Sequence, residues 1–364
     1  MAKSSNSSGK PGAGPKGPAG EETCAAVDLG TNNCRLLVAQ PRPKGFRVVE
    51  AFSRIVRLGE GLEAKGRLSE AAMVRTTAAL KICAEKIRRN RARRVRAVAT
   101  AACRAASNCE AFVAQVRQQT GLELEIISSR EEAQLALAGC APLLTRERPR
   151  AIVFDIGGGS TEVTWLALED PEADPGEPVG AGRDPDAPPA GLRVLGSESL
   201  PLGVVTFAER FGGRRVKPEA YRAMVAEVQA AFAPFEARHG LSRSVAAQEV
   251  QMLGTSGTVT TLAGVHRDLK RYDRKRIDGV RLEFDAVRET VRKIRAMGYE
   301  ERLGHPCIGR NRADLVLAGC AILEALCVLW PVGQLRVADR GLREGILFHM
   351  MNGHRVDGWS GRRK

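Results

Sequence analysis

Aromatic residues are scarce in this chain: Phe, Tyr and Trp together make up 4% of its 364 residues. Hydrophobic residues still make up 43%, so we expect most of the chain to fold around cores of Leu, Val, Ala and Ile. No apolar run reaches the roughly 18 residues that a membrane span needs. The polar N-terminus does not have the pattern of a signal peptide. We therefore expect no membrane partner.

Clusters of metal-binding or disulfide-forming residues are also missing. The five histidines are dispersed, and no two of the nine cysteines form a Cys-x-x-Cys pair; the cysteines stand at positions 24, 34, 83, 103, 109, 140, 307, 320 and 327. This scatter indicates neither a zinc site nor a disulfide framework. The expectation is a cytoplasmic protein with reduced, buried thiols.

The formal net charge is +14, which favours polyanionic partners such as nucleic acid, polyphosphate or nucleotides. A basic balance is also common in arginine-rich chains that have no such partner. The most basic run, residues 86–94, reads as the solvated end of a helix. It contains no aromatic residue on which bases could stack, so no specific nucleic-acid partner is expected.

The glycine-rich segment 153–163, VFDIGGGSTEV, holds the strongest local pattern. Apolar residues on both sides of the glycines predict two strands joined by a tight turn, because glycine allows the positive φ angles of short hairpins. Successive N–H groups in such a turn can hold phosphate oxygens, and Asp155 at the strand end can reach a magnesium ion. The alternative is an ordinary glycine hairpin.

A second copy of this pattern lies near the N-terminus, in AAVDLGTNNCRLLV at residues 25–38. In both copies an apolar strand is followed by Asp-x-Gly, a small polar turn and a second apolar strand. Aligning the copies places Asp28 at the position of Asp155. A duplication at this separation predicts two similar domains rather than a short-period repeat. Two facing turns of this kind predict a cleft in which phosphate is held from both walls.

The remaining pattern alternates strands and helices, which predicts an α/β architecture. Strands are expected near residues 47–52, 95–99, 124–127, 250–253 and 335–337, and helices over 69–89, 128–140, 219–238, 285–297 and 314–330. The polar segment 1–22 is expected to be a disordered tail, 169–191 a flexible insert and 353–364 a basic tail.

A third glycine and hydroxyl loop follows the strand near 250–253. Its residues Gly254, Thr255, Ser256, Gly257 and Thr258 open a helix, so their N–H groups suit a phosphate or nucleotide. The loop also follows a buried strand, where ligands bind in α/β sheets. The alternative is a simple helix cap.

Glu132 is the candidate catalytic residue. Hydrolysis of a phosphoanhydride requires an oriented water and a carboxylate to position or deprotonate it. The alternative is a capping box, in which Glu132 reaches back to the Ser129 N–H. Arg104 can clamp a phosphate or pair with an acid, and Asp339 and Arg343 can close the cleft or cap the last helix.

Taken together and in order, six segments resemble the exopolyphosphatase and guanosine pentaphosphate phosphatase (Ppx/GppA) family: AAVDLGTNNCRLLVA, ATAACRAASN, IISSREEAQL, VFDIGGGSTEV, GTSGTVTTLAG and ADRGLREGIL. The resemblance implies two ribonuclease-H-like domains of the actin-like ATPase superfamily flanking a cleft. Domain I would span residues 23–149, with the last helix, 340–352, packed back on it. Domain II would span 150–339.

The resemblance also implies an activity: hydrolysis of the terminal phosphoanhydride bonds of inorganic polyphosphate, releasing orthophosphate with Mg²⁺ or another divalent cation. One alternative is a 5′-phosphohydrolase of guanosine pentaphosphate (pppGpp). Another is a non-catalytic sensor that binds polyphosphate or the guanosine tetra- and pentaphosphates. By analogy with the family, a homodimer is expected.

The family's site residues fall on matching positions of this sequence. The family's catalytic glutamate matches Glu132, and its metal ligands match Asp155 and Glu162. The family's phosphate contacts fall on Asp28, Gly30, Thr31, Asn32, Arg104, Gly157, Gly158 and Gly159. To these we add the hydroxyl pair after the glycines, Ser160 and Thr161, and the third loop, Gly254, Thr255, Ser256, Gly257 and Thr258.

Three positions depart from the family's pattern: Gln134, where the family has arginine, Ser129, where it has glycine, and Arg340, where it has a small residue. These departures bear on rate and substrate preference rather than on the class of reaction. Longer members of the family continue into helical domains that extend the polymer channel, so processive action on long chains is not part of the expectation.

Overall fold

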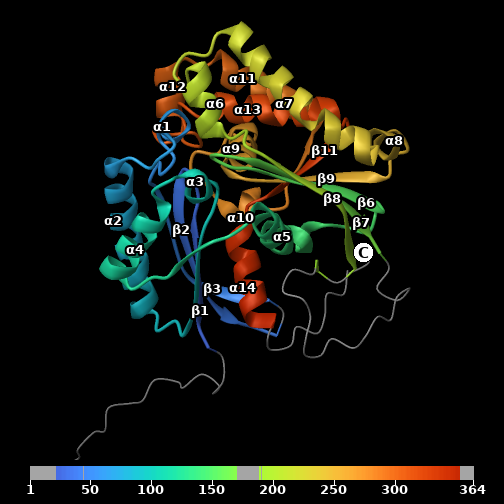
Figure 1. Cartoon of the computed structure of the whole chain (residues 1–364). Coiled ribbons are helices and arrows are strands. Elements are labelled where there is room, and N and C mark those ends of the chain that lie inside the picture. Colours follow the sequence, from blue (N-terminus) through green and yellow to red (C-terminus); the bar gives the residue numbers. More distant parts are fainter. Residues whose placement is uncertain (1–21, 44, 170–187, 190, 353–364) are drawn as a thin grey trace, which may run out of the picture.

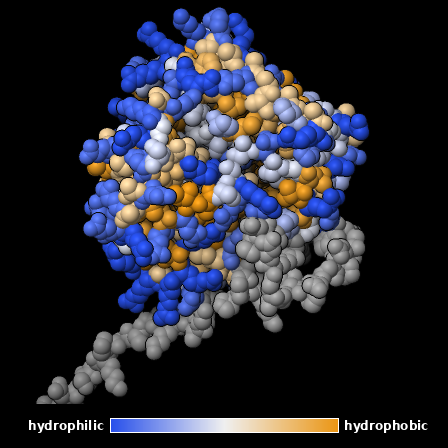
Figure 2. Space-filling model, viewed as in Figure 1, coloured by the Kyte–Doolittle hydropathy of each residue, from blue (hydrophilic) through white to orange (hydrophobic). Residues whose placement is uncertain are grey.

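The computed structural model describes residues 22–43, 45–169, 188–189 and 191–352, and the predicted tails and nearly all of the polar insert lie outside these ranges. Two β-sheets with helices between and outside them form the molecule (Figure 1). Hydrophilic residues cover most of the face in Figure 2, with apolar residues in smaller patches. Among the described residues, no helix is both long and apolar enough to cross a membrane.

The first sheet has the strand order β3-β2-β1-β4-β5. Strands β1, β2 and β3 form an antiparallel meander, and β4 and β5 run parallel to β1. The bounds are β1 Cys24–Leu29, β2 Asn33–Pro41, β3 Phe46–Ile55, β4 Arg94–Ala99 and β5 Leu124–Ile126.

The second sheet repeats this plan. Strands β8, β7, β6, β9 and β11 follow one another in the order and directions of β3, β2, β1, β4 and β5, and β10 adds an antiparallel edge. The bounds are β6 Arg150–Ile156, β7 Thr161–Leu168, β8 Leu192–Leu200, β9 Val250–Thr255, β10 Arg281–Glu283 and β11 Gln334–Ala338. The duplication predicted from the two Asp-x-Gly hairpins is therefore a duplication of the whole sheet.

Helices α2 (Glu70–Arg89) and α4 (Cys109–Thr120) cover the outer face of the first sheet. Ser69 caps α2, because its side chain accepts a hydrogen bond from the Ala72 N–H at 3.2 Å. The short helices α1 (Leu62–Lys65) and α3 (Ala101–Ala105) lie in the connections before α2 and after β4.

The outer face of the second sheet carries a larger helical layer (Figure 1). Helix α13 is buried along nearly its whole length, as its continuous apolar sequence predicts. The bounds in this part are α6 Val204–Phe211, α7 Pro218–His239, α8 Leu241–Ala246, α9 Gly257–His266, α10 Arg274–Ile277, α11 Phe284–Ala296, α12 Tyr299–Gly304 and α13 Val316–Leu329.

Two helices lie between the sheets: α5 (Ser129–Cys140), which is followed by the 3₁₀ turn η1 (Ala141–Leu143), and α14 (Leu342–Asn352). Each follows the last parallel strand of one sheet and packs against the other, since α5 contacts β6, β7 and β8 while α14 contacts β1 and β2. The two helices touch through glycine: a Cβ on Gly345 would lie 1.8 Å from the Leu135 carbonyl oxygen. Together they join the two sheets tightly.

Candidate active site

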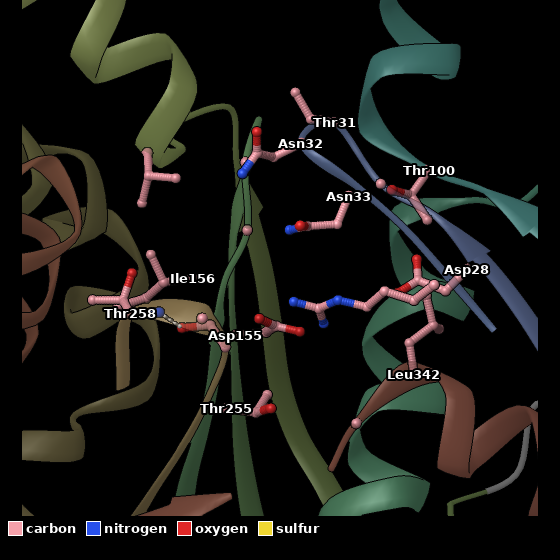
Figure 3. A pocket seen from close by; sticks show the side chains of 18 of the residues that line it. Asp28, Thr31, Asn32, Asn33, Thr100, Asp155, Ile156, Thr255, Thr258 and Leu342 are labelled. Carbon is pink, nitrogen blue, oxygen red and sulfur yellow. Dashed lines mark hydrogen bonds between the residues drawn. The ribbon is translucent and has the colours of Figure 1, made fainter. Parts of the chain in front are cut away.

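A cleft of about 140 Å³ opens between the two sheets at the carboxyl ends of β1 and β6. Figure 3 shows Asp28 and Asp155 on opposite sides of this space, with Thr31 and Asn32 at one end and Thr255 and Leu342 at the other. Glu132 also lines the cleft. The two Asp-bearing turns and the candidate catalytic carboxylate therefore meet in one cavity, as predicted.

Strand register explains why these side chains point inward. Asp28 pairs directly with Arg35 across β1 and β2, and Asp155 pairs with Glu162 across β6 and β7. Directly paired residues of antiparallel strands share one face of a sheet. This face of the first sheet packs on α5 and α14, and this face of the second sheet packs on α5. Each hairpin thus directs two charged side chains toward the space between the sheets.

The two hairpin turns touch across the cleft. A Cβ on Gly158 would lie 2.9 Å from Thr31 Cβ and 3.1 Å from the Asn32 N, and one on Gly159 would lie 2.7 Å from Thr31 Oγ1. Any side chain at these glycines would therefore separate the two walls. The expectation that the glycines supply positive φ angles was wrong, since neither Gly30 nor 157–159 adopts one. Close approach, rather than turn geometry, requires glycine here.

Glu132 stands in the first turn of α5 but does not cap it. The N-cap is Ser128, whose hydroxyl accepts from the Glu131 N–H at 3.1 Å. Glu132 instead accepts a hydrogen bond from Arg104 at 2.8 Å, and its side chain is 17% exposed. The capping-box alternative is therefore excluded, and the carboxylate is available to the cleft.

Arg104 does not line the cleft directly. Its guanidinium also donates to the Ile127 carbonyl at 3.0 Å, which fixes it behind Glu132. Burial raises the pKa of Glu132, the positive charge of Arg104 opposes this rise, and the nearby Asp28 adds to it. Arg104 thus holds the carboxylate in place and favours its ionised form. Its predicted contact with phosphate remains a prediction.

Replacing Arg104 by glutamine is expected to move the acid limb of the pH–activity profile to higher pH. A general base must be ionised to act, and removing the neighbouring positive charge raises its pKa further. The measurement is kcat/KM against pH. Arg96→Gln is the matched control, because Arg96 pairs with Glu131 of the same helix. An unmoved acid limb in Arg104→Gln, or an equal shift in Arg96→Gln, would contradict this role.

The carboxylates of the cleft disfavour one another's ionisation. Burial raises the pKa of Asp155 to about 7, with Glu132 and Asp28 adding to the rise. Burial raises the pKa of Glu162 to about 8, with Glu132 and Asp155 adding to it. A cavity of this kind attracts a cation, since a bound positive charge relieves the repulsion between carboxylates.

Asp155→Asn is expected to stabilise the metal-free protein, and increasingly so as the pH rises. A carboxyl whose folded pKa is raised contributes stability below its unfolded pKa near 4, and that contribution is lost as the pH rises through about 7. In the presence of a chelator, the Tm of the variant minus that of the wild type should widen by several degrees between pH 4.5 and 8. The control is Asp285→Asn, whose side chain is 90% exposed, and its Tm difference from the wild type should not change with pH. A Tm difference for Asp155→Asn that stays constant between pH 4.5 and 8 would refute the expectation.

The cleft suits a magnesium ion that keeps most of its water. Within the described residues, no three His, Cys, Asp or Glu side chains converge as a ready-made metal site. Mg²⁺ is commonly held by one or two carboxylates together with substrate phosphates and water, and Asp155 supplies such a carboxylate. Asn32 Oδ1 is buried without a hydrogen-bond partner and can accept from a metal-bound water. Glu162 does not line the cleft and accepts from Ser199 Oγ at 2.9 Å, so its predicted role as a metal ligand remains a prediction.

The third loop is divided between the cleft and the core. Residues 255–258 line the cleft, but the Ser256 hydroxyl caps α9 by accepting from the N–H groups of Thr258 and Val259. Ser256 has a φ of 135°, a strained conformation of the type that gathers at functional sites.

Two predicted phosphate contacts are misplaced. Gly254 packs against the ring of Phe154, which a Cβ would meet at 2.4 Å. Thr161 is fully buried and donates to the Leu202 carbonyl at 2.6 Å. Neither lines the cleft, so the structure assigns both to packing. The other predicted turn residues, Gly30, Thr31, Asn32, Gly157, Gly158, Gly159 and Ser160, do line it.

Three arginines bring positive charge to the cleft: Arg343, which the sequence offered as a residue that closes it, and Arg35 and Arg312, which were not predicted. Arg35, Arg312 and Arg343 line it from β2, from the loop before α13 and from the start of α14. Arg35 lowers the pKa of both other arginines, after the larger effect of burial, so the three positive charges lie near one another. The period-2 pattern of β2 places Arg35 on the face of Asp28 and could have revealed it. Nothing in the local sequence marks Arg312.

Comparison with known proteins agrees with this geometry. The model of the Ppx/GppA phosphatase family matches residues 37–187 and 189–354. The chain belongs to the Ppx/GppA phosphatase family. It is 30% identical over 335 residues to exopolyphosphatase 2 of Mycobacterium tuberculosis, covering 88% of this chain and 96% of that protein. The chain is therefore a phosphatase, a hydrolase with the function of the exopolyphosphatase family.

Solved structures place it in the same group. The crystal structure of the Aquifex aeolicus member of the Ppx/GppA family is 25% identical and superposes with a TM-score of 0.70, covering 92% of this chain and 100% of that one. An exopolyphosphatase from Cytophaga hutchinsonii has a TM-score of 0.77 at 22% identity over 93% of this chain and all of that one, which speaks for the fold alone. The two-domain actin-like fold of Ppx/GppA proteins is thus the fold of this chain, while the boundaries at 149 and 339 remain a prediction.

One departure from the Ppx/GppA pattern is compensated within the structure. Arg340 lines the cleft, but its guanidinium is paired with Asp278, with Nε 3.0 Å from Oδ2. Asp278 also accepts from the Asp339 N–H at 3.0 Å. The added positive charge is therefore neutralised by a neighbour, and the pair fixes the turn that leads into α14. Gln134, the other departure on α5, does not line the cleft.

Proposed function

We propose that the protein is an exopolyphosphatase that removes the terminal phosphate of inorganic polyphosphate with the help of Mg²⁺ or another divalent cation. The observation that carries this proposal is the position of Glu132, held by Arg104 at 2.8 Å in the cleft that also contains Asp28 and Asp155. A carboxylate so placed can orient and deprotonate a water for attack on phosphorus.

Different groups of the protein bind the substrate and activate the attacking water. The turns offer the backbone N–H groups of residues 31–32 and 158–159 to oxygens of the terminal phosphate, while those of Gly30 and Gly157 close the hairpins by donating to the Asn33 and Ser160 carbonyls. Arg35 adds a positive charge from β2. Glu132 accepts the proton of the attacking water. The narrow contact between the turns limits the bulk water around the reacting phosphorus.

The cation fits beside Asp155, because Asp155 supplies a carboxylate and the unpaired Asn32 Oδ1 can accept from a water of the cation. When bound, it would neutralise charge that develops on the phosphate oxygens. Because Asp155 has a raised pKa, binding of the cation would compete with a proton. We therefore expect the affinity for Mg²⁺ to rise with pH through neutrality.

A substrate panel tests the proposal. Purified protein with Mg²⁺ is incubated separately with polyphosphate, pppGpp and ATP, and released orthophosphate is measured. Release from polyphosphate in preference to the nucleotides supports the proposal. Release from pppGpp alone would identify a pppGpp 5′-phosphohydrolase instead, and binding of either compound without release would identify a sensor. The predicted homodimer remains a prediction.

A further inference from the structure

The cleft is too small for a long polymer. Its volume is about 140 Å³, far less than a polymer of many phosphate groups occupies. It holds a short run of phosphate groups, so the rest of a bound polyphosphate must lie on the protein surface. One end of the cleft is narrowed where Gly158 and Gly159 meet Thr31. The chain is then expected to leave by the other end, beside Asp339 and Arg312.

An exposed basic surface borders that end. We define the basic rim as Lys270, Arg271, Lys275, Arg276 and Arg310, all of which are exposed. The segment 266–276, from which four of them come, contains six Lys and Arg residues against two acids, Asp268 and Asp273. Asp273 is used as the N-cap of α10, accepting from the Lys275 N–H at 3.0 Å.

Residues adjacent to the basic rim contact the cleft directly. Arg274 donates to Glu344 at 2.7 Å and lies 3.7 Å from Asp339. Both acids line the cleft, and Figure 1 shows α10 beside the start of α14. Tyr272 lies beside the Asp339 carboxylate. Arg310 stands two residues before Arg312, which lines the cleft and donates to Thr261 at 2.8 Å.

The charges of the rim are uncommitted. In the part of the chain that the structure describes, none of its five side chains has an ion pair within 4 Å, although many arginines elsewhere do, such as Arg96 with Glu125 and Glu131. Two acids close to α10 are already engaged: Asp278 pairs with Arg340, and Glu344 pairs with Arg274. A row of exposed, unpaired cations attracts a polyanion, and screening by salt weakens that attraction.

We propose that the basic rim is a subsite for the part of a polyphosphate chain that extends beyond the cleft, and that it makes the enzyme favour long chains over short ones. This inference rests on the proposed function. The rim binds the phosphates that do not react, while the cleft holds the terminal phosphate. Loss of the rim should therefore weaken binding of long chains and leave the hydrolysis step unchanged.

The test is a charge-reversal triple, Lys270→Glu with Arg271→Glu and Lys275→Glu. Its matched control, Lys81→Glu with Arg88→Glu and Arg91→Glu, changes the net charge equally at exposed positions in and just after α2. KM and kcat are measured on long-chain polyphosphate and on tripolyphosphate at several salt concentrations. We expect the rim triple to raise KM for the long chain about tenfold or more, to flatten its dependence on salt, and to leave tripolyphosphate hydrolysis within about twofold.

Two results would overturn the subsite: an equal rise of KM in the control triple, or an equal loss on tripolyphosphate by a rim triple whose circular dichroism is unchanged. Binding of long-chain polyphosphate, measured by titration, separates this inference from the proposed function. If the wild type binds the polymer through the rim but releases no phosphate, the proposed function fails and the subsite stands. If the rim triple binds the polymer as tightly as the wild type does, the subsite fails whatever the activity.

Discussion

Glu132→Gln should lower kcat on polyphosphate by about 10²- to 10⁴-fold, the usual contribution of a positioned general base. Glutamine has nearly the same shape and can still accept the hydrogen bond from Arg104, so the fold and the position of the side chain should be kept. What is lost is the ability to take a proton from water. KM should change much less than kcat, because substrate is bound by the turns and arginines rather than by this carboxylate.

The matched control is Glu131→Gln. Glu131 precedes Glu132 on α5, but its carboxylate faces Arg96 and it does not line the cleft. The control should keep activity within about twofold, since the loss of a partly exposed ion pair costs little. Similar losses in both variants would show that the helix, and not the carboxylate at 132, accounts for the effect.

Gly345→Ala is expected to destabilise the protein strongly and to reduce its activity. A Cβ at this position would lie 1.8 Å from the Leu135 carbonyl oxygen, so α5 and α14 would have to move apart. Overpacking of this kind costs about 1–3 kcal/mol, which corresponds to a fall in Tm of several degrees. Leu135 is three residues from Glu132, so the same displacement would shift the catalytic carboxylate within the cleft.

Gly304→Ala provides the comparison, because a Cβ on Gly304 meets nothing within 4 Å. Alanine is otherwise the better helix former, and on propensity alone Gly345→Ala would stabilise α14 by up to about 1 kcal/mol. A Tm for Gly345→Ala at or above that of the wild type would mean that the two helices are not in the contact described here. Thermal unfolding followed by circular dichroism gives the answer.

Much of this fold was predictable from the sequence because its signals are local. The two Asp-x-Gly hairpins indicated the duplicated sheets, and the helices expected over 69–89, 219–238 and 314–330 are confirmed as α2, α7 and α13. Strand β8 and helix α6 went unpredicted. β8 follows the polar insert and mixes Gly and Ser with its apolar residues. Helix α6 has only 8 residues, too few for its apolar periodicity to stand out.

The site was predictable where function and strand ends coincide, and unpredictable where long-range contacts decide. The repeated Asp-x-Gly hairpin pattern predicted Asp28 and Asp155, and the resemblance to the family predicted Glu132. The pairing of Arg104 with Glu132, the arrival of Arg312 from another part of the chain and the packing role of Gly254 depend on residues far apart in sequence. The reason for glycine at 158 was also hidden, because its neighbour is the turn of the other sheet.

The central claim is that two matching turns close on a terminal phosphate which Glu132 faces. A crystal structure of the Glu132→Gln variant with Mg²⁺ and a short polyphosphate tests it most directly. We expect the terminal phosphate between residues 30–32 and 157–159, within hydrogen-bond distance of backbone N–H groups of both turns, with a water between its phosphorus and residue 132. A terminal phosphate bound to one turn only, or bound outside the cleft, would contradict the account.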